Sequence, residues 1–306
     1  MPWVTIIVLN WNGLADTLEC LESLAGLDYP TYEVVVVDND STDGSVEAIR
    51  ARFPQVTLIE NGENLGFAGG NNVGMCYAMD QGTDYVLLLN NDTIVDPEFL
   101  TTLVKAAESD PSIGIVSPIL YYYDEPHTIW CAGASIDWRR GVTHRLRAEE
   151  PDDGQDERIH EVDFVSGCAL LAKSSVVKDT GLMDHEFFLY YEEADWCVRA
   201  RAQGYRIVFV RAAKVWHKVS RSAGQDTPLV SYYMTRNTLR FLWKNLSGGR
   251  RLLAVFRHTV RTLRTILSLW IKHRHSKART DATARVRGLL DFVGGRFGPL
   301  QDSQLG

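Results

Sequence analysis

The run Tyr85-Val86-Leu87-Leu88-Leu89 is apolar and ends directly on Asn90-Asn91-Asp92. A short apolar run closed by polar residues is typical of a β-strand buried on both faces. A second acidic cluster, Glu192-Glu193-Ala194-Asp195, occurs much later and is followed by Trp216-His217. The pattern thus combines a carboxylate at the end of a buried strand with a second carboxylate cluster and a late histidine. These groups suit a site that holds a divalent metal on a diphosphate and places a base beside it.

The segments before this run repeat an alternation of strand and helix. Residues 4–9 and 32–37 are apolar runs rich in β-branched residues, and each ends on polar residues, beginning with Asn10 and Asp38 respectively. Strands alternating with helices indicate a parallel sheet with both faces covered, and ligands bind at the carboxyl ends of such strands. We therefore expect Asn10, Asp38 and Asp92 to meet on one rim, although a single cluster of this kind is more often an ordinary Asx turn.

The second half of the chain is less regular. Strands are expected over residues 113–118, 164–171, 205–210 and 214–217, and a helix over residues 192–203. Residues 121–163 show no clear periodicity, and the acidic stretch 152–157 is expected to be a solvated loop with no catalytic role. The predicted fold class is thus α/β, with a mostly parallel sheet and helices on both faces.

The composition suits a globular protein with one large domain and a tail, or with two domains: 45% of the 306 residues are hydrophobic. The five cysteines are odd in number and widely spaced, so neither a disulfide framework nor a zinc site is expected. No basic segment precedes the first apolar run, and no apolar stretch is free of charge over the ~18 residues that a membrane span needs. We expect a cytoplasmic protein, at the inner face of the cell membrane if its tail binds there.

The charge of the chain is unevenly distributed. Residues 243–297 contain thirteen Lys or Arg and two acidic residues, a net charge of +11, whereas the whole chain carries −7 and the remainder therefore −18. A basic tail on an acidic body argues for an anionic partner, with a membrane surface or nucleic acid as candidates. We expect the membrane surface and no nucleic acid.

The tail also has an amphipathic pattern. Its apolar residues recur at helical spacing, namely Leu252, Phe256, Val260, Leu263, Leu267 and Trp270. Arginines fall on the opposite side, at positions 250, 257, 261 and 264. The pattern predicts a basic amphipathic helix that lies on an anionic membrane, or alternatively a helix that packs on the body of the protein with its arginines in solvent.

Five motifs follow one another along the chain: Thr5-Ile6-Ile7-Val8-Leu9-Asn10-Trp11-Asn12-Gly13, Val37-Asp38-Asn39-Asp40-Ser41-Thr42-Asp43-Gly44-Ser45, Asn64-Leu65-Gly66-Phe67-Ala68-Gly69-Gly70-Asn71-Asn72-Val73-Gly74, Phe187-Phe188-Leu189-Tyr190-Tyr191-Glu192-Glu193-Ala194-Asp195 and Tyr233-Met234-Thr235-Arg236-Asn237. As an ordered set they resemble the family 2 glycosyltransferases of the GT-A fold, and among these the rhamnosyltransferase-type members. The resemblance implies a GT-A domain over residues 1–245, followed by the basic helical tail over 246–306. Within that domain, residues 1–118 would form the nucleotide-binding half and 119–245 the acceptor-binding half.

The resemblance implies an inverting transfer of a sugar, with rhamnose as a candidate. The donor would be a dTDP- or UDP-linked sugar, and the acceptor a glycan or polyprenyl-linked molecule of the cell surface. Glu193 is the expected general base, with Glu192 and Asp195 as alternatives, although an acid in the first turn of a helix is also favoured simply by the helix dipole. Asp92 and His217 are expected to hold Mg²⁺ or Mn²⁺ against the diphosphate, whereas a lone histidine is more often structural.

The remaining site residues are assigned to the nucleotide and its diphosphate. This set comprises Leu9, Asn10, Asp38, Asn39, Gly66, Gly69, Gly70, Asn71, Asn91 and Arg221, with Lys218 and Ser222 as further donors to the phosphates. Asp38 and Asn39 would bind the base and ribose, and the glycines would let the backbone approach the nucleotide closely.

Two positions depart from the family pattern. Asn90-Asn91-Asp92 stands where an Asp-x-Asp or Asp-Asp motif is usual, so weaker metal affinity is expected, and Glu193 stands where the family often has aspartate. The missing first aspartate is the best argument for a catalytically silent nucleotide- or glycan-binding module. A sugar nucleotidyltransferase is the other alternative, but such enzymes usually open with a basic glycine-rich loop, and Asn10-Trp11-Asn12-Gly13 lacks the basic residues.

Overall fold

The computed structural model describes residues 1–152, 154, 158–219, 227–272 and 276–300. Within them the main sheet has ten strands in the order β10-β12-β6-β11-β4-β1-β2-β3, with β5 paired to β12 and β7 to β6. The N-terminal strands are β1 (Val4–Asn10), β2 (Tyr32–Asp38), β3 (Thr57–Glu60) and β4 (Tyr85–Asn90). The helices of this half are α1 (Leu14–Leu24), α2 (Ser45–Arg52), α3 (Gly66–Gln81) and α4 (Phe99–Glu108).

The N-terminal half has the predicted parallel arrangement. β1 pairs in parallel with β2 and with β4, and the register sets Asn10 opposite Asp38 and Leu9 opposite Asn90. Successive side chains of a strand point to opposite faces, so Ile7 packs in the core under α3 while Ile6 packs in the core under α1 and α4. The polar ends of β1, β2 and β4 therefore lie on one rim, as the sequence predicts.

The second half contains β6 (Ile113–Tyr122), β11 (Ala169–Lys173), α5 (Ser174–Thr180), a 3₁₀ turn (His185–Phe187), α6 (Glu192–Ala202) and β12 (Arg206–His217). β11 runs antiparallel between β4 and β6, whereas β6 and β12 are parallel to each other. The two strands expected over 205–210 and 214–217 are one strand with an irregularity between Val210 and Lys214. The fold is the mixed, mostly parallel α/β sheet that was expected.

Short strands occur where the sequence showed no periodicity. They are β5 (Thr93–Val95), β7 (Ile129–Cys131), β8 (Ala134–Asp137), β9 (Val142–Arg145) and β10 (Ile159–Glu161). Of these, β5 matters most for function, because it pairs with β12 and sets Thr93 opposite His217. Strands of three or four residues are too short to give a periodic signal.

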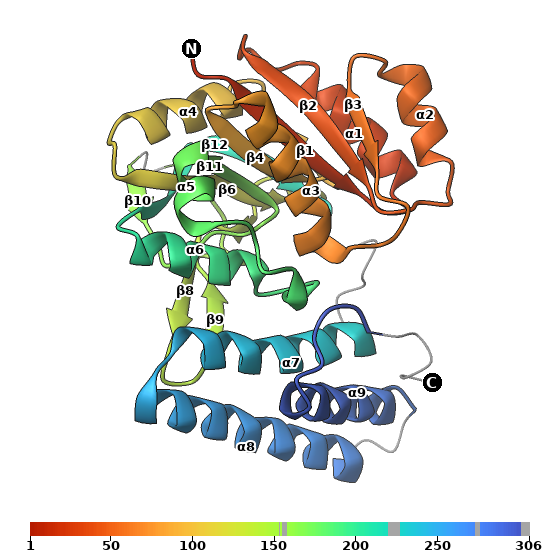
Figure 1. Cartoon of the computed structure of the whole chain (residues 1–306), viewed down its shortest axis with the longest axis vertical. Helices are drawn as coiled ribbons and strands as arrows, with labels where there is room; N and C mark the ends of the chain where they lie inside the picture. Colours follow the sequence, from red (N-terminus) through yellow and green to blue (C-terminus); the bar gives the residue numbers. More distant parts are fainter. Residues whose placement is uncertain (153, 155–157, 220–226, 273–275, 301–306) are drawn as a thin grey trace.

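Three C-terminal helices form a separate layer on one side of the sheet domain (Figure 1). They are α7 (Pro228–Asn245), α8 (Gly248–Lys272) and α9 (Ser276–Val293), and α7 packs on both of the others. α7 thus packs with the tail helices, and the domain boundary between residues 245 and 246 stays a prediction. In the described part of the chain, none of the helices combines the length and the apolarity that crossing a membrane requires.

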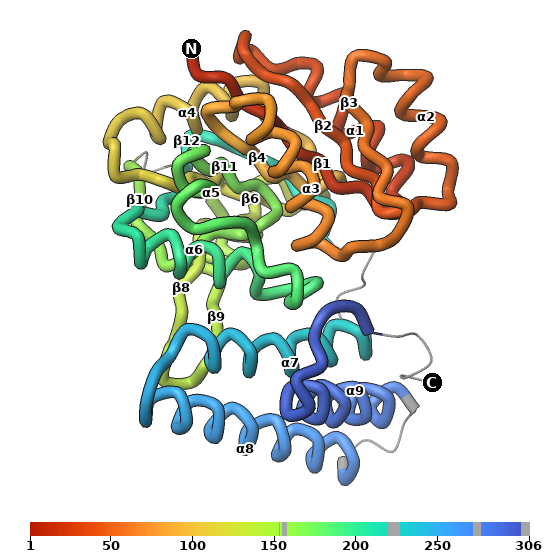
Figure 2. Tube along the Cα trace, viewed as in Figure 1, coloured from red at the N-terminus to blue at the C-terminus, as the bar shows by residue number. Residues whose placement is uncertain are grey.

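The helical layer is tied to the sheet domain at two places. The β8–β9 hairpin reaches down to α7 (Figure 1), where Trp138 stacks on Phe241 with ring centroids 5.3 Å apart. After α9 the chain returns past α7 (Figure 2), and the Gly298 carbonyl accepts a 2.7 Å hydrogen bond from Arg236. These contacts hold α7 close to the segment that precedes the acidic cluster at 192–195.

Candidate active site

The rim at the ends of β1, β2 and β4 is a buried hydrogen-bond network. Asn10 is fully buried, and its amide donates to Asp38 Oδ2 at 2.6 Å and to Ser45 Oγ at 2.9 Å. Its carbonyl oxygen accepts from Thr17 Oγ1 at 2.7 Å and from Asn91 Nδ2 at 3.2 Å. Buried polar groups of this kind are strongly held because leaving one unpaired costs about 1–3 kcal/mol. Asn10 and Asn91 thus fix the shape of the rim through contacts inside the protein.

Asp38 and Asn39 are also almost completely enclosed. Asp38 is 1% exposed, and it accepts hydrogen bonds from Asn10 and from the backbone and hydroxyl of Ser41. Asn39 is 2% exposed and donates to the Gly66 carbonyl at 3.1 Å. The two residues connect the end of β2 to the start of α3, and their expected contacts with base and ribose stay a prediction.

The glycine-rich stretch forms the first part of α3, which begins at Gly66. A Cβ added at Gly70 would lie 2.3 Å from Leu9 and 3.0 Å from Asn39, and one at Gly69 would lie 2.8 Å from Leu65. Asn71 donates to the Phe67 carbonyl at 2.9 Å. The glycines therefore let α3 pack closely on β1 and β2, and a direct approach to nucleotide remains a prediction.

Asp92 and His217 lie side by side at the end of this rim. The distance from His217 Nε2 to Asp92 Oδ1 is 3.1 Å, and the two residues are 5% and 8% exposed respectively. The β5–β12 pairing brings them together, and the Asp92 carbonyl accepts from the Lys218 backbone at 2.9 Å. The ring of Trp130 packs edge-on against His217, with ring centroids 4.5 Å apart.

This pair suits a divalent cation. A carboxylate oxygen and an imidazole nitrogen converge, and both are ligand types that Mn²⁺ and Mg²⁺ sites use. Across the described ranges no group of three or more His, Cys, Asp or Glu side chains could hold a metal. The protein would therefore supply two ligands, and phosphate oxygens and water would have to supply the others.

Of the predicted phosphate donors, Lys218 is the one that the structure describes. Lys218 Nζ donates to Asp16 Oδ1 at 2.8 Å and also pairs with Glu19, so α1 already neutralises its charge. Arg221, together with Ser222, lies outside the described residues. Lys218 is thus already ion-paired in this arrangement, and its contact with the diphosphate stays a prediction.

Glu192 and Glu193 begin α6 and differ in environment. Burial raises the pKa of Glu193 to about 6, while backbone N–H groups at the helix start oppose the rise. Burial and the neighbouring Glu193 charge raise the pKa of Glu192 well above its usual value. One carboxyl oxygen of each side chain is buried and has no hydrogen-bond partner among the described residues. Burial and the neighbouring charge thus disfavour the ionised form of Glu192, and the pKa of Glu193 lies near the range in which a general base works.

Asp195, the other candidate base, has a structural environment instead. It is fully buried and accepts hydrogen bonds from Arg199 at 2.9 Å, Lys244 at 2.8 Å and Asn245 at 2.9 Å. A carboxylate held by two cations and an amide cannot take a proton from a substrate without breaking these contacts. Asp195 therefore ties α6 to α7.

The segment before the acidic pair is strained and firmly held. Phe188, Tyr190 and Tyr191 have φ values of 64°, 70° and 78°, a region that costs non-glycine residues about 1–3 kcal/mol each. Asn237 Nδ2 donates to the carbonyls of Phe187, Leu189 and Tyr190 at 2.8–3.0 Å. The sequence predicts no task for the motif ending in Arg236-Asn237, which holds the segment that leads into Glu192 and Glu193.

Glu193 lies close to the rim. The Asn90 backbone donates to the Cys168 carbonyl at 2.8 Å, which places the preceding Gly167 beside the end of β4. A Cβ at Gly167 would lie 3.7 Å from the Glu193 Cβ and 2.9 Å from the Phe67 ring. The start of α3, the end of β4 and the first turn of α6 therefore border one region, with the Asp92–His217 pair on the same rim.

Comparisons of the sequence agree with this geometry. The sequence model of the family described as Glycosyl transferase family 2 matches residues 5–178. N-acetylglucosaminyl-diphospho-decaprenol L-rhamnosyltransferase of Mycobacterium tuberculosis is 28% identical over 295 residues, covering 89% of this chain and 93% of that protein. dTDP-rhamnosyl transferase RfbF of Shigella flexneri is 25% identical, covering 78% and 79%. The hexosyltransferase Agl10 of Haloferax volcanii is 27% identical, and the chain spans 63% of its length.

Comparisons of the structure agree on the fold. The mannosyltransferase PcManGT of Pyrobaculum calidifontis, in complex with GDP-Man and Mn²⁺, superposes with a TM-score of 0.60 at 16% identity, covering 96% of this chain and 88% of that one. S. aureus TarS 1–349, in complex with UDP-GlcNAc, gives a TM-score of 0.59 at 18% identity, covering 95% and 80%. The chain therefore has the GT-A fold. Together the comparisons favour a glycosyltransferase over a sugar nucleotidyltransferase or a silent binding module.

Proposed function

Because the chain belongs to glycosyl transferase family 2, we propose that it transfers a sugar from a nucleoside-diphosphate sugar to an acceptor hydroxyl with inversion. Glu193 is the general base in this proposal, and Asp92 with His217 holds Mn²⁺ or Mg²⁺. The observation that carries it is the environment of Glu193: a buried carboxyl oxygen without a partner and a pKa of about 6, on the rim shared with Asp92 and His217.

The chemistry follows from these placements. The acceptor oxygen attacks the anomeric carbon on the face opposite the diphosphate, the bond to the diphosphate oxygen breaks, and Glu193 takes the acceptor proton. A base with a pKa near the working pH is ionised before the reaction and basic enough to accept a proton during it. A bound divalent metal would neutralise the charge that develops on the leaving nucleoside diphosphate. Asn237, Arg236 and the ion pairs of Asp195 keep the first turn of α6 in place while this occurs.

The relatives support a finer proposal for the substrates. Two of them are rhamnosyltransferases by name, one acting from dTDP-rhamnose and one on a diphospho-decaprenol acceptor. We therefore propose dTDP-rhamnose as the first donor to test and a polyprenyl-diphosphate-linked sugar as the acceptor. The enzyme would then take part in cell-surface glycan synthesis.

The test is a panel of dTDP-, UDP- and GDP-linked sugars incubated with polyprenyl-diphospho-N-acetylglucosamine and Mn²⁺. Mass spectrometry detects the glycosylated product, and NMR of the new linkage gives its anomeric configuration. Inversion with a rhamnose donor supports the proposal in full. Retention of configuration would rule out the single-step role of Glu193, and transfer from another donor alone would replace rhamnose.

We also place the outer face of α8 at an anionic membrane. Its large apolar side chains are exposed, with Phe256 at 65%, Leu267 at 59% and Ile271 at 67%, together with Leu252, Leu253, Leu263 and Trp270. The packed face carries fewer large apolar residues: Ala254, His258, Thr262 and Ile266 are buried there. These side chains are thus accessible to a partner, although α8 also packs on α7 and α9.

The charge around the stripe indicates an anionic lipid surface as its occupant. Arg250, Arg257 and Arg264 are exposed on the same helix, and each basic residue near an anionic leaflet contributes about 1 kcal/mol of binding. Co-sedimentation with neutral and anionic vesicles tests this placement. Binding to anionic vesicles should fall for Phe256→Glu and persist for the control Trp3→Glu, an exposed aromatic residue before β1. Equal binding by both variants would remove α8 from the interface.

A further inference from the structure

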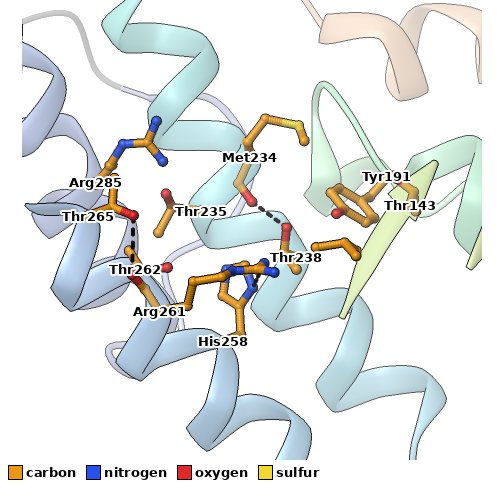
Figure 3. Close-up of a pocket in the computed structure, with 11 residues that line it drawn as sticks. Thr143, Tyr191, Met234, Thr235, Thr238, His258, Arg261, Thr262, Thr265 and Arg285 are labelled. Atoms are coloured by element: carbon orange, nitrogen blue, oxygen red, sulfur yellow. Dashed lines mark hydrogen bonds between the residues drawn. The ribbon is translucent and has the colours of Figure 1, made fainter. Parts of the chain in front are cut away.

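A cavity lies away from the rim, where α7, α8 and α9 meet the β9 strand and the residue before α6. Its volume is about 230 Å³, which is roomy enough for a phosphate group and water. Figure 3 shows its lining, which includes His258, Arg261, Thr262, Thr235, Arg285 and Tyr191. The lining combines threonine hydroxyls, an imidazole and two guanidinium groups with apolar side chains such as Val142 and Met234.

His258 presents a hydrogen-bond donor that has no acceptor. The residue is 6% exposed, and its Nδ1 lies 2.9 Å from Arg261 Nη2. A guanidinium only donates, so Nδ1 must accept and the proton of the neutral ring must be on Nε2. Nε2 is buried and has no partner among the residues described. An unpaired buried donor beside a cavity is best explained by a ligand or water that accepts from it.

The cavity is also electropositive. Arg261 has no carboxylate within ion-pair distance among the described residues, whereas Arg285 is paired with Asp281 at 3.0 Å. Burial, followed by the charges of Arg261 and Arg285, lowers the pKa of His258 to about 4, so the ring is neutral at pH 7. The buried hydroxyls of Thr235 and Thr262 add two further groups that can donate.

The cavity adjoins the proposed base. Tyr191 lines it and is the residue directly before α6, two positions from Glu193. Burial raises the pKa of the Tyr191 phenol; Thr238, Thr143 and Arg261 oppose the rise, and Glu193 adds to it. The phenol thus lies within electrostatic reach of both the cavity arginine and the base. The other face of α8 carries the exposed apolar stripe, so the same helix borders the cavity on one side and the proposed lipid surface on the other.

We propose that this cavity binds a phosphate group of the acceptor, namely the diphosphate between lipid and sugar in a lipid-linked substrate. Arg261, the His258 Nε2–H and the threonine hydroxyls bind the phosphate oxygens, while the acceptor sugar extends past Tyr191 toward Glu193. The inference rests on the proposed function for the identity of the acceptor, but the anion site can be measured without catalysis.

The experiment is calorimetric titration of the inactive Glu193→Gln protein with a short-chain prenyl diphosphate, in EDTA so that no metal at Asp92 takes part. Introducing Arg261→Gln should weaken binding at least tenfold, since a charge-assisted hydrogen bond is lost. Arg257→Gln is the matched control, because Arg257 is an exposed arginine one turn earlier on α8 that does not line the cavity. Thr262→Val removes a hydroxyl from the cavity at nearly constant volume and should weaken binding several-fold.

Two further ligands distinguish the sources of the phosphate. Tighter binding of prenyl diphosphate than of glycerol 3-phosphate or inorganic phosphate supports an acceptor site. Tighter binding of glycerol 3-phosphate would assign a phospholipid headgroup and overturn the proposal, as would equal affinities of the Arg261→Gln and Arg257→Gln proteins. A wild-type protein that binds prenyl diphosphate but transfers no sugar would count against the proposed function and leave the anion site standing.

Discussion

Replacing Glu193 by glutamine should make the protein more stable while it makes the enzyme inactive. The side chain keeps its shape, but the charge that burial disfavours is removed. The pKa of Glu193 in the folded protein is about 6, against 4.5 for the ordinary side chain. That difference in pKa corresponds to about 2 kcal/mol in the free energy of unfolding, at a pH where the carboxylate is ionised in both the folded and the unfolded protein.

The sign follows from proton binding. The folded protein holds the Glu193 proton more tightly than the unfolded chain does. The ionised side chain therefore lowers the free energy of unfolding of the wild type, and it does so only at pH values at which it loses its proton. The gain from Glu193→Gln should therefore be absent below pH 4.5, grow between pH 4.5 and 6, and reach about 2 kcal/mol above pH 6. Sugar transfer should fall ~10²–10⁴-fold at the same time, which is the usual contribution of a general base.

Urea unfolding at pH 7.5 and pH 4.5 measures the first effect, and initial rates of transfer measure the second. Glu47→Gln is the matched control, since Glu47 is an exposed acid in the first turn of α2. That variant should lose about 0.3–1 kcal/mol through the helix dipole. A Glu193→Gln protein that is less stable than wild type at pH 7.5, or equally stabilised at both pH values, would refute the account of its environment.

Three further predictions concern other parts of the site. Asp92→Asn should remove most of the gain in nucleoside diphosphate affinity that Mn²⁺ gives, as measured by calorimetry with and without EDTA. Mutating a residue that only supports a metal ligand typically lowers metal affinity by roughly 10–100-fold, and loss of the ligand itself should cost more. Unchanged metal dependence would exclude Asp92 as a ligand. Asp195→Asn should destabilise the protein by roughly 3 kcal/mol in urea unfolding, because Arg199 and Lys244 lose a fully buried partner, and a change under 1 kcal/mol would contradict the structural role. Raising the salt concentration from 0.05 to 0.5 M should reduce co-sedimentation with anionic vesicles, since the arginines of α8 are screened, and salt-independent binding would indicate purely apolar attachment.

Much of the fold could be predicted because β1, β4 and the second half of β2 are buried on both faces and read as continuous apolar runs. The meeting of Asn10, Asp38 and Asp92 on one rim follows from the parallel order of β1, β2 and β4. Their hydrogen bonds do not follow from it, because they depend on side chains such as Thr17 and Ser45, which come from the helices after the strands.

The parts that sequence could not supply depend on contacts between distant segments. Asp195 looked like an alternative base because Lys244, its partner, comes from another helix. The outward face of α8 was open to two interpretations, since an apolar stripe alone does not show which side the rest of the protein covers. The three-residue strand β5 was missed, although it is what brings Asp92 to His217.

The pH dependence of kcat/KM tests the central claim, that an ionised Glu193 takes the proton from the acceptor. The diphosphate of a nucleotide sugar does not titrate between pH 5 and 8. A fall in kcat/KM toward low pH within this range therefore reports a group of the enzyme or of its complex with the acceptor. With saturating Mn²⁺, kcat/KM of the wild type should fall tenfold per pH unit below about 6, and the residual activity of Glu193→Gln should lack this fall. A wild-type profile that is flat from pH 5 to 8, or the same fall in Glu193→Gln, would contradict the assignment of Glu193 as the base.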